Sequence, residues 1–221
     1  DVLLTAKFDD KERLKQIVME EKAGLESGLT PAGHRFANMR LRSQFGGAGW
    51  LNDQTHGIGY LFALRELAAE IDKKWSNVLK KLETLRETLI TSKTLTCNVT
   101  LNAGHWKNFQ PHLENFIFAM PVKDAQLSPF NVEPATQKEG LAIPAQVNYV
   151  AKGANLYDHG YELDGSSMVI VGYLGMTHLW EKIRVQGGAY GAFAQFDDTT
   201  GVFTYLSYRD PNVDATLKNY D

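Results

Sequence analysis

Apolar residues recur at every third or fourth position through most of the first 120 residues, the spacing that places them on one side of an α-helix. The helices predicted in this way begin near Lys11, Thr30, Asp53, Trp75 and Trp106. Asp10 before the first helix is a candidate N-cap, and Thr30 with Pro31 gives the second an N-cap followed by proline. Another helix begins at Ser166 or Ser167 and is apolar nearly all round from Met168 to Leu174, so we expect it to be buried. A further helical segment leads to Arg184.

Other segments have the alternation or the composition of a strand with one buried face. The predicted strands are 94–101, 145–149, 190–196 and 202–208, and residues 2–6 are strand-like as well. Cys97 lies on the apolar side of the strand 94–101, so it is predicted to be a packed, inert thiol. Residues 197–201 read as a hairpin loop, which predicts that the last two strands pair antiparallel.

Helices mixed with antiparallel strands predict an α+β fold. Proline, serine and glycine interrupt the pattern between Pro121 and Gly140, so we predict a linker at 121–142 between an α+β region at 1–120 and a second at 143–221. The chain opens at Asp1 without Met, and its last apolar stripe has barely begun at Tyr220. Both regions are therefore expected to be truncated parts of a longer polypeptide.

Charge and cysteine content exclude several classes of partner. The formal net charge of the 221 residues is −3, so no broad basic field attracts nucleic acid or an anionic membrane. No apolar run reaches the roughly 18 residues of a membrane span, and no leader of the secretory type is visible. The single cysteine, Cys97, excludes an internal disulfide and fits a reducing compartment. The sequence thus predicts no nucleic-acid partner, no membrane partner and no secretion.

The stretch from Arg184 to Gly191 carries most of the candidate chemistry. Gly187 and Gly188 permit a sharp turn between the helical segment that ends at Arg184 and the strand that begins at Tyr190. A guanidinium and a phenol on either side of one turn could bind a carbonyl oxygen as it gains negative charge, which acyl-transfer chemistry requires. The same residues also fit ordinary surface architecture, and the spacing alone does not decide between the two interpretations.

Two other patterns could carry chemistry. Arg35, Arg40 and Arg42 form a basic cluster that fits either a solvated, ion-paired face or a contact with an acidic peptide. His178 and Glu181 have the spacing of the inverted zinc motif His-x-x-Glu-His, but a lysine occupies its last position. Zinc in a catalytic site needs at least three protein ligands, so we expect this chain to bind no metal or other cofactor by itself.

Several spaced motifs together resemble one family. Leu179–Gly191, Ser207–Asn212, Pro144–Val150 and Gly153–Tyr157 resemble the fourth domain of the presequence protease and falcilysin branch of the pitrilysin/insulinase metallopeptidases. Upstream, the segments Glu20–Ala23, Gly33–Phe36 and Gly49–Leu51 look like the third domain of the same branch. The resemblance covers nearly the whole chain, and the motifs occur in the family's order.

The resemblance implies a clam-like zinc endopeptidase in which four related α+β domains enclose a chamber where short unfolded peptides are cut. It implies that Arg184 and Tyr190 hold the substrate backbone at the scissile bond, beside Gly187 and Gly188. Zinc would be bound by the N-terminal half of the same polypeptide, so the isolated chain is expected to be inactive. The expected location is a bacterial cytoplasm or the matrix of a mitochondrion or plastid. A non-catalytic scaffold or peptide-binding relative, and a free-standing interaction domain, are the alternatives.

Overall fold

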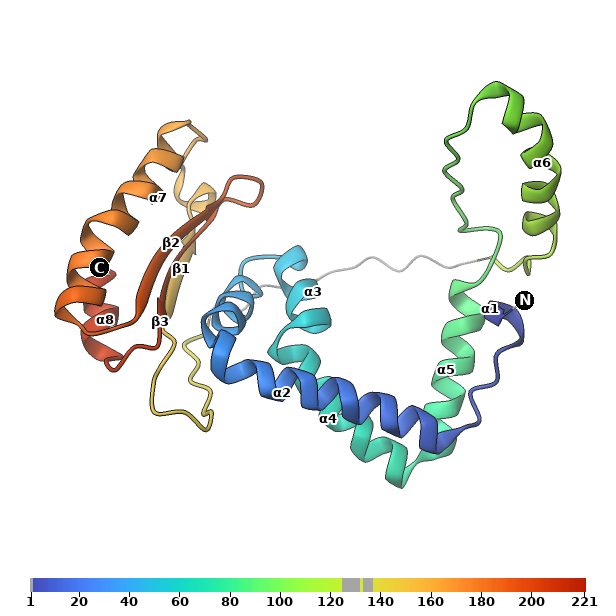
Figure 1. Cartoon of the computed structure of the whole chain (residues 1–221), viewed down its shortest axis with the longest axis horizontal. Coiled ribbons are helices and arrows are strands. Elements are labelled where there is room, and N and C mark those ends of the chain that lie inside the picture. Colours follow the sequence, from blue (N-terminus) through green and yellow to red (C-terminus); the bar gives the residue numbers. More distant parts are fainter. Residues whose placement is uncertain (1, 125–131, 133–136) are drawn as a thin grey trace. The chain divides into compact units, whose positions relative to one another are not determined.

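The computed structural model of the chain describes residues 2–124, 132 and 137–221 (Figure 1). Residues 125–131 and 133–136 of the predicted linker 121–142 lie outside the described residues. The fold is α+β, as predicted, and it divides into two compact units. The first unit comprises 1–19 with 66–129, and the second comprises 20–65 with 130–221. The predicted boundary between the two α+β regions stays a prediction.

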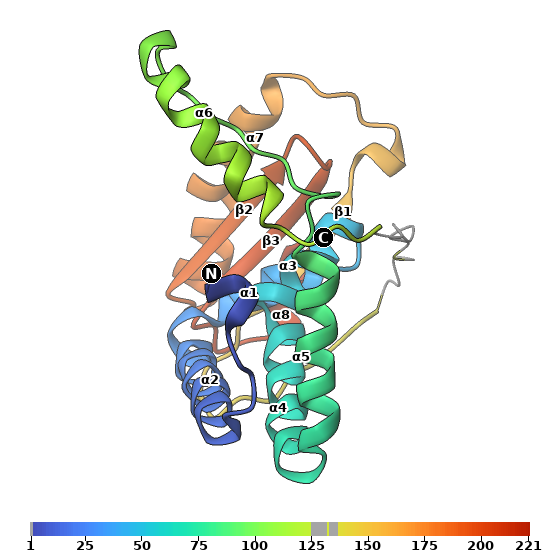
Figure 2. The ribbon, with the colours of Figure 1, turned by 90° about the vertical axis from the view of Figure 1, so that its right-hand side faces the viewer.

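The first unit is helical. Its elements are α1 (Val2–Thr5), the start of α2 (Lys11–Arg42), the end of α4 (Ile58–Lys73), α5 (Trp75–Leu89) and α6 (Ala103–Phe118). The end of α4 lies beside α5, where Lys81 Nζ donates to Glu70 Oε2 at 2.8 Å (Figure 2). The strand predicted at 2–6 is wrong. Ala6 N–H donates to Val2 O at 2.9 Å, a bond within the chain that satisfies a short helix without any partner strand.

The strand predicted at 94–101 is also wrong. The segment has no ladder to any strand among the described residues, and a strand needs such a partner for its backbone hydrogen bonds. Cys97 is exposed, so its prediction as a packed thiol is wrong as well. The apolar side of α6 is likewise open, with Trp106, Phe109 and Phe116 all exposed. The period of an amphipathic segment indicates which side is apolar and leaves open what covers that side.

The two longest predicted helices differ from the observed ones at a proline and at a glycine. Instead of two helices separated near Gly28–Pro31, the chain forms the single helix α2, kinked at Ala32 (φ −125°, ψ 23°) directly after Pro31. Proline removes one helical hydrogen bond and clashes with the preceding turn, which explains the kink. The helix predicted from about Asp53 to Asp72 is divided at Gly57 into α3 (Gly47–His56) and α4.

The second unit contains a three-stranded antiparallel sheet of order β1-β3-β2. Its strands are β1 (Ala151–Asn155), β2 (Gly191–Asp197) and β3 (Val202–Tyr208). The hairpin of β2 and β3 confirms the prediction to within one residue, and its register pairs Gly191 with Tyr208. The strand predicted at 145–149 is wrong. That segment makes only the bridge Asn148–Asp210, and the ladder to β3 begins at Ala151.

Helices lie on both faces of this sheet. One face carries α7 (Ser166–Met176), the π-helix η2 (Trp180–Gln186) and α8 (Asp214–Asn219), and a 3-10 turn η1 (Tyr157–His159) follows β1 (Figure 1). Leu179 and Ile183 of this layer are fully buried in a core with Val150, Ala189 and Tyr220. The C-terminal part of α2 packs on the other face, where Asn38 Nδ2 donates to Gln195 Oε1 at 2.9 Å.

Helix α7 confirms the prediction of a helix from Ser166 but corrects the prediction that it is buried. Its residues Met168, Val169, Ile170, Tyr173 and Met176 are all exposed. The reason is that the sheet covers only one side of α7, and no other described element covers the opposite side.

Candidate functional site

The double-glycine corner joins η2 to β2 as the sequence predicts. Gly187 keeps a helical conformation (φ −81°, ψ −19°), and Gly188 turns the chain with φ +80°, which an L-residue adopts only at a cost. The turn closes with Gly188 N–H donating to Arg184 O at 3.0 Å and Ala189 N–H donating to Ile183 O at 3.1 Å. The chain therefore reverses within two residues and brings the end of η2 beside the start of β2.

The corner brings the two predicted site residues together on one surface. Arg184 Nη1 donates to the backbone oxygen of Tyr190, and the guanidinium carbon lies 5.2 Å from the centre of the Tyr190 ring. The same guanidinium carbon lies 4.7 Å from the ring of Trp180, a contact that the sequence analysis missed. The Tyr190 side chain is 63% exposed. A cation and a phenol therefore stand side by side at an open surface.

Tyr190 is fixed by its backbone. Its N–H donates to Tyr208 O at 3.0 Å and also lies 3.3 Å from the oxygen of Arg209, the one described non-glycine residue with a positive φ (+48°). The Tyr190 ring meets the edge of the Tyr208 ring at 5.7 Å. Asn212 Nδ2 donates to Gly187 O at 2.6 Å and ties the same corner to the segment that precedes α8.

An aromatic cluster lies behind the corner. His34 of α2 meets the Tyr208 ring edge-on at 4.8 Å and lies 5.9 Å from Phe193, and Tyr149 lies 5.8 Å from Tyr208. His34 Nδ1 is buried and has no hydrogen-bond partner among the described residues. Burial lowers the pKa of His34, and the nearby charge of Arg35 lowers it further. No sequence pattern could identify this cluster, because its members come from segments far apart along the chain.

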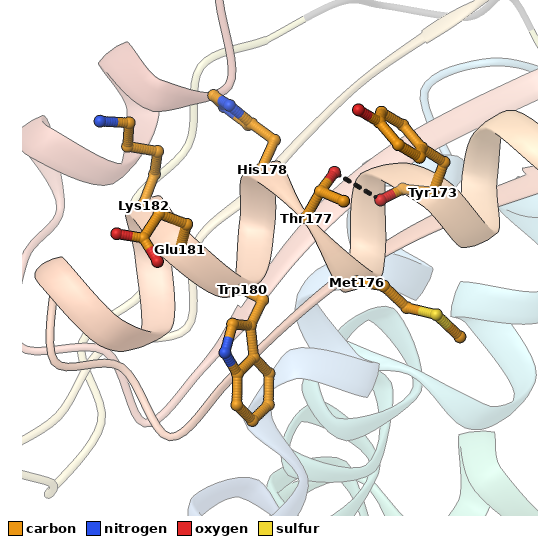
Figure 3. A pocket seen from close by; sticks show the side chains of 7 residues that line it. All are labelled: Tyr173, Met176, Thr177, His178, Trp180, Glu181 and Lys182. Carbon is orange, nitrogen blue, oxygen red and sulfur yellow. Dashed lines mark hydrogen bonds between the residues drawn. The ribbon is translucent and has the colours of Figure 1, made fainter.

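A surface pocket of about 460 Å³ follows the junction of α7 and η2 (Figure 3). Its lining includes His178 and Glu181, the two residues with zinc-motif spacing. His178 Nε2 lies 2.7 Å from the backbone oxygen of Asn219, and Glu181 Oε1 accepts from Gln186 Nε2 at 2.8 Å. In Figure 3 His178 and Trp180 project from different sides of the helix, so the pocket residues do not converge on one centre. Among the described residues, no group of three or more His, Cys, Asp or Glu side chains could hold a metal ion.

The basic cluster of α2 is an ion-paired face for two of its three members. Arg40 donates to Asp53 Oδ2 at 3.0 Å and to Glu139 Oε2 at 2.7 Å, and Arg42 pairs with Asp197. Asp53 is fully buried and also accepts from the N–H of Ile58 at 3.0 Å, so it caps the start of α4. The importance of Asp53 was not predicted, because its partners become visible only when α3 and α4 are folded.

No helix among the described residues has the length and apolar character needed to cross a membrane.

Comparisons with known proteins place the chain among peptidases. A family of peptidase-associated domains matches residues 1–67, and the family described as "PreP C-terminal domain" matches residues 138–221. The chain is similar to presequence protease 1, chloroplastic/mitochondrial, of Arabidopsis thaliana (38% identity over 221 residues, 100% of this chain and 20% of that protein). It is similar to the protein HypA of Clostridium perfringens (32% over 214 residues, 97% of this chain and 22% of that protein). A mitochondrial presequence protease of Yarrowia lipolytica is 30% identical over 231 residues, 99% of this chain and 22% of that protein.

These matches confirm the resemblance read from the motifs. The chain spans about a fifth of the length of the curated relatives it matches.

Proposed function

Because this chain belongs to the presequence protease family, we propose that it is part of the C-terminal half of a zinc metalloendopeptidase that degrades short unfolded peptides. The observation that carries the proposal is the pairing of Arg184 with Tyr190 at one exposed corner. Its partners would be peptide substrates and the N-terminal half of the same polypeptide. The names of the relatives favour a bacterial cytoplasm or the matrix of a mitochondrion or plastid as its location.

The described residues do not fit a zinc site. His178 is committed to the backbone oxygen of Asn219, and the third position of the motif is Lys182, whose ammonium group is no ligand. In this proposal, residues of the longer protein outside this chain hold the zinc. The 221-residue chain by itself is then expected to show no peptidase activity, with or without added zinc.

Arg184 and Tyr190 would act on the carbonyl of the scissile peptide bond. A guanidinium carries five N–H donors in one plane, and Tyr190 O occupies at least one of them. The rings of Trp180 and Tyr190 lie against the guanidinium, so its remaining donors are directed along its plane toward the surface. The phenol of Tyr190 adds a neutral O–H donor beside this cation. Two such donors would stabilise the oxygen as it gains negative charge, more than they stabilise the neutral carbonyl.

Gly187 and Gly188 would serve substrate binding through their backbone. The left-handed conformation at Gly188 sets the distance between Arg184 and Tyr190, and neither glycine carries a side chain that would obstruct a peptide at the corner.

Tyr190→Phe in the full-length enzyme tests the proposal, because it removes the donor and keeps the ring. Loss of one oxyanion donor is expected to lower kcat about 10²- to 10³-fold with little change in KM. Tyr173→Phe is the matched control, since Tyr173 is a 66% exposed tyrosine of α7 without contact to Arg184 in the structure. The donor role of Tyr190 fails if turnover by Tyr190→Phe stays within about threefold of wild type.

A further inference from the structure

We propose that Trp180 is a positioning residue for Arg184, and that it holds the guanidinium in the orientation in which Arg184 and Tyr190 act together. The inference rests on the function proposed for Arg184. The geometry behind it is a stack of three side chains. The guanidinium carbon of Arg184 lies 4.7 Å from the Trp180 ring and 5.2 Å from the Tyr190 ring.

Trp180 is placed where core packing does not explain it. Its side chain is 50% exposed, and it does not belong to the buried cluster that Leu179 and Ile183 form on the sheet side of η2. Tryptophan has the strongest attraction for a cation over its ring face. The contact that distinguishes this indole is therefore its contact with Arg184.

The π-helical geometry of η2 makes the stack possible. Trp180 and Arg184 are four residues apart, and a turn bonded from i to i+5 holds more residues than the 3.6 of an α-helix. A residue four positions on therefore lies more nearly in line with the first than it would in an α-helix. The bond from Gln186 Nε2 to Glu181 Oε1, at 2.8 Å, spans five positions and supports this wider turn. Lys182 Nζ donates to Gln186 Oε1 at 3.2 Å and adds a second support.

The stack compensates for a weakness in how Arg184 is held. The backbone of the corner is fixed by hydrogen bonds at Gly188, Ala189 and Tyr190, whereas the guanidinium stands at the end of a long, rotatable side chain. Its one described hydrogen bond to protein goes to Tyr190 O. Without the indole on its other face, the guanidinium could swing into water. It would then have to be reordered in every catalytic cycle.

Four variants of the full-length enzyme test the inference: Trp180→Leu, Trp180→Phe, Arg184→Ala, and Trp180→Leu combined with Arg184→Ala. Trp180→Leu is expected to lower kcat about 3- to 30-fold, the range that corresponds to measured cation–π strengths, and to leave KM within about twofold. Trp180→Phe keeps an aromatic face and is expected to recover most of the loss. Tyr173→Leu removes another exposed aromatic residue of the same helical layer and should leave kcat within about twofold of wild type.

The double variant separates positioning from other roles. If Trp180 acts through Arg184, Trp180→Leu has no further effect once Arg184 is alanine. A further loss in the double variant would mean that Trp180 contacts the peptide or maintains the fold, and it would overturn the inference. So would an unchanged kcat in Trp180→Leu when Arg184→Ala is impaired. If Arg184→Ala itself keeps wild-type turnover, the proposed role of Arg184 fails, and the inference falls with it.

Discussion

Gly188→Ala is the substitution for which the structure predicts the clearest change in stability. Gly188 has φ +80°, and a left-handed conformation costs an L-residue about 1–2 kcal/mol. An added Cβ would meet only Pro211 Cγ at 3.6 Å, an ordinary contact, so no steric term adds to that cost. Alanine also restricts the unfolded chain, which offsets about 0.4–1 kcal/mol. The expected net loss in the free energy of unfolding is about 1 kcal/mol.

Two further variants make this prediction specific to the backbone conformation. Asparagine tolerates the left-handed region better than alanine, so Gly188→Asn is expected to lose less. Gly172→Ala is the matched control. Gly172 lies in α7 with nothing within 4 Å of an added Cβ, so alanine is expected to stabilise the protein there by about 0.5–1 kcal/mol.

Urea denaturation measures all three variants on the same scale. A Gly188→Ala protein as stable as wild type, or a loss shared equally by Gly172→Ala, would refute the reasoning. Gly187→Ala should be worse than Gly188→Ala, because its Cβ would lie 2.6 Å from the backbone oxygen of Ile183. In the full-length enzyme Gly188→Ala is also expected to lower kcat, since the turn sets the separation of Arg184 and Tyr190.

Three further predictions concern buried polar groups. Asp53→Ala leaves the Ile58 N–H and Arg40 without their acceptor and should cost about 3–5 kcal/mol in urea denaturation, whereas Asp72→Ala, which breaks an exposed pair with a lysine, should leave the denaturation midpoint nearly unchanged. Burial raises the pKa of Tyr220, so its contribution to the free energy of unfolding is constant below about pH 10 and is lost as the pH rises above it; Tyr220→Phe should reduce that alkaline loss in denaturation curves at about pH 8 and pH 11. Burial lowers the pKa of His34, so stability should fall as the pH drops below about 6.5, and His34→Gln should flatten the difference between about pH 7 and pH 5.

The candidate site could be predicted from sequence because it is local. Arg184 and Tyr190 are six positions apart, and a helical segment, two glycines and a strand are enough to bring them to one corner. The hairpin of β2 and β3 was predictable for the same reason, because the turn between the strands fixes their pairing. The family resemblance adds the role of the two residues, which their spacing alone leaves undecided.

Features that depend on distant partners could not be predicted. Residues 94–101 and 145–149 have the composition of strands, yet a ladder forms only where a partner is available, and β3 pairs instead with Ala151–Asn155. The exposure of α7 shows the converse limit. A helix that is apolar all round is expected to be buried on every side, and here the sheet covers one side only. The π-turn of η2 has no signal in the apolar pattern, so the stack of Trp180 on Arg184 was missed.

The way in which the corner is held explains which of its parts substitutions should disturb most. A site that stabilises a developing charge is effective when its donors are already in place, so that no energy is spent on ordering them. At this corner Tyr190 is held by β3 through its own N–H, and Gly187 is held by Asn212 from the segment before α8. The phenol therefore takes its position from the sheet, and distant changes in stability should affect it little. The guanidinium takes its position from side chains alone, so the orientation of Arg184 depends on Trp180 and on the width of the π-turn that aligns the two residues.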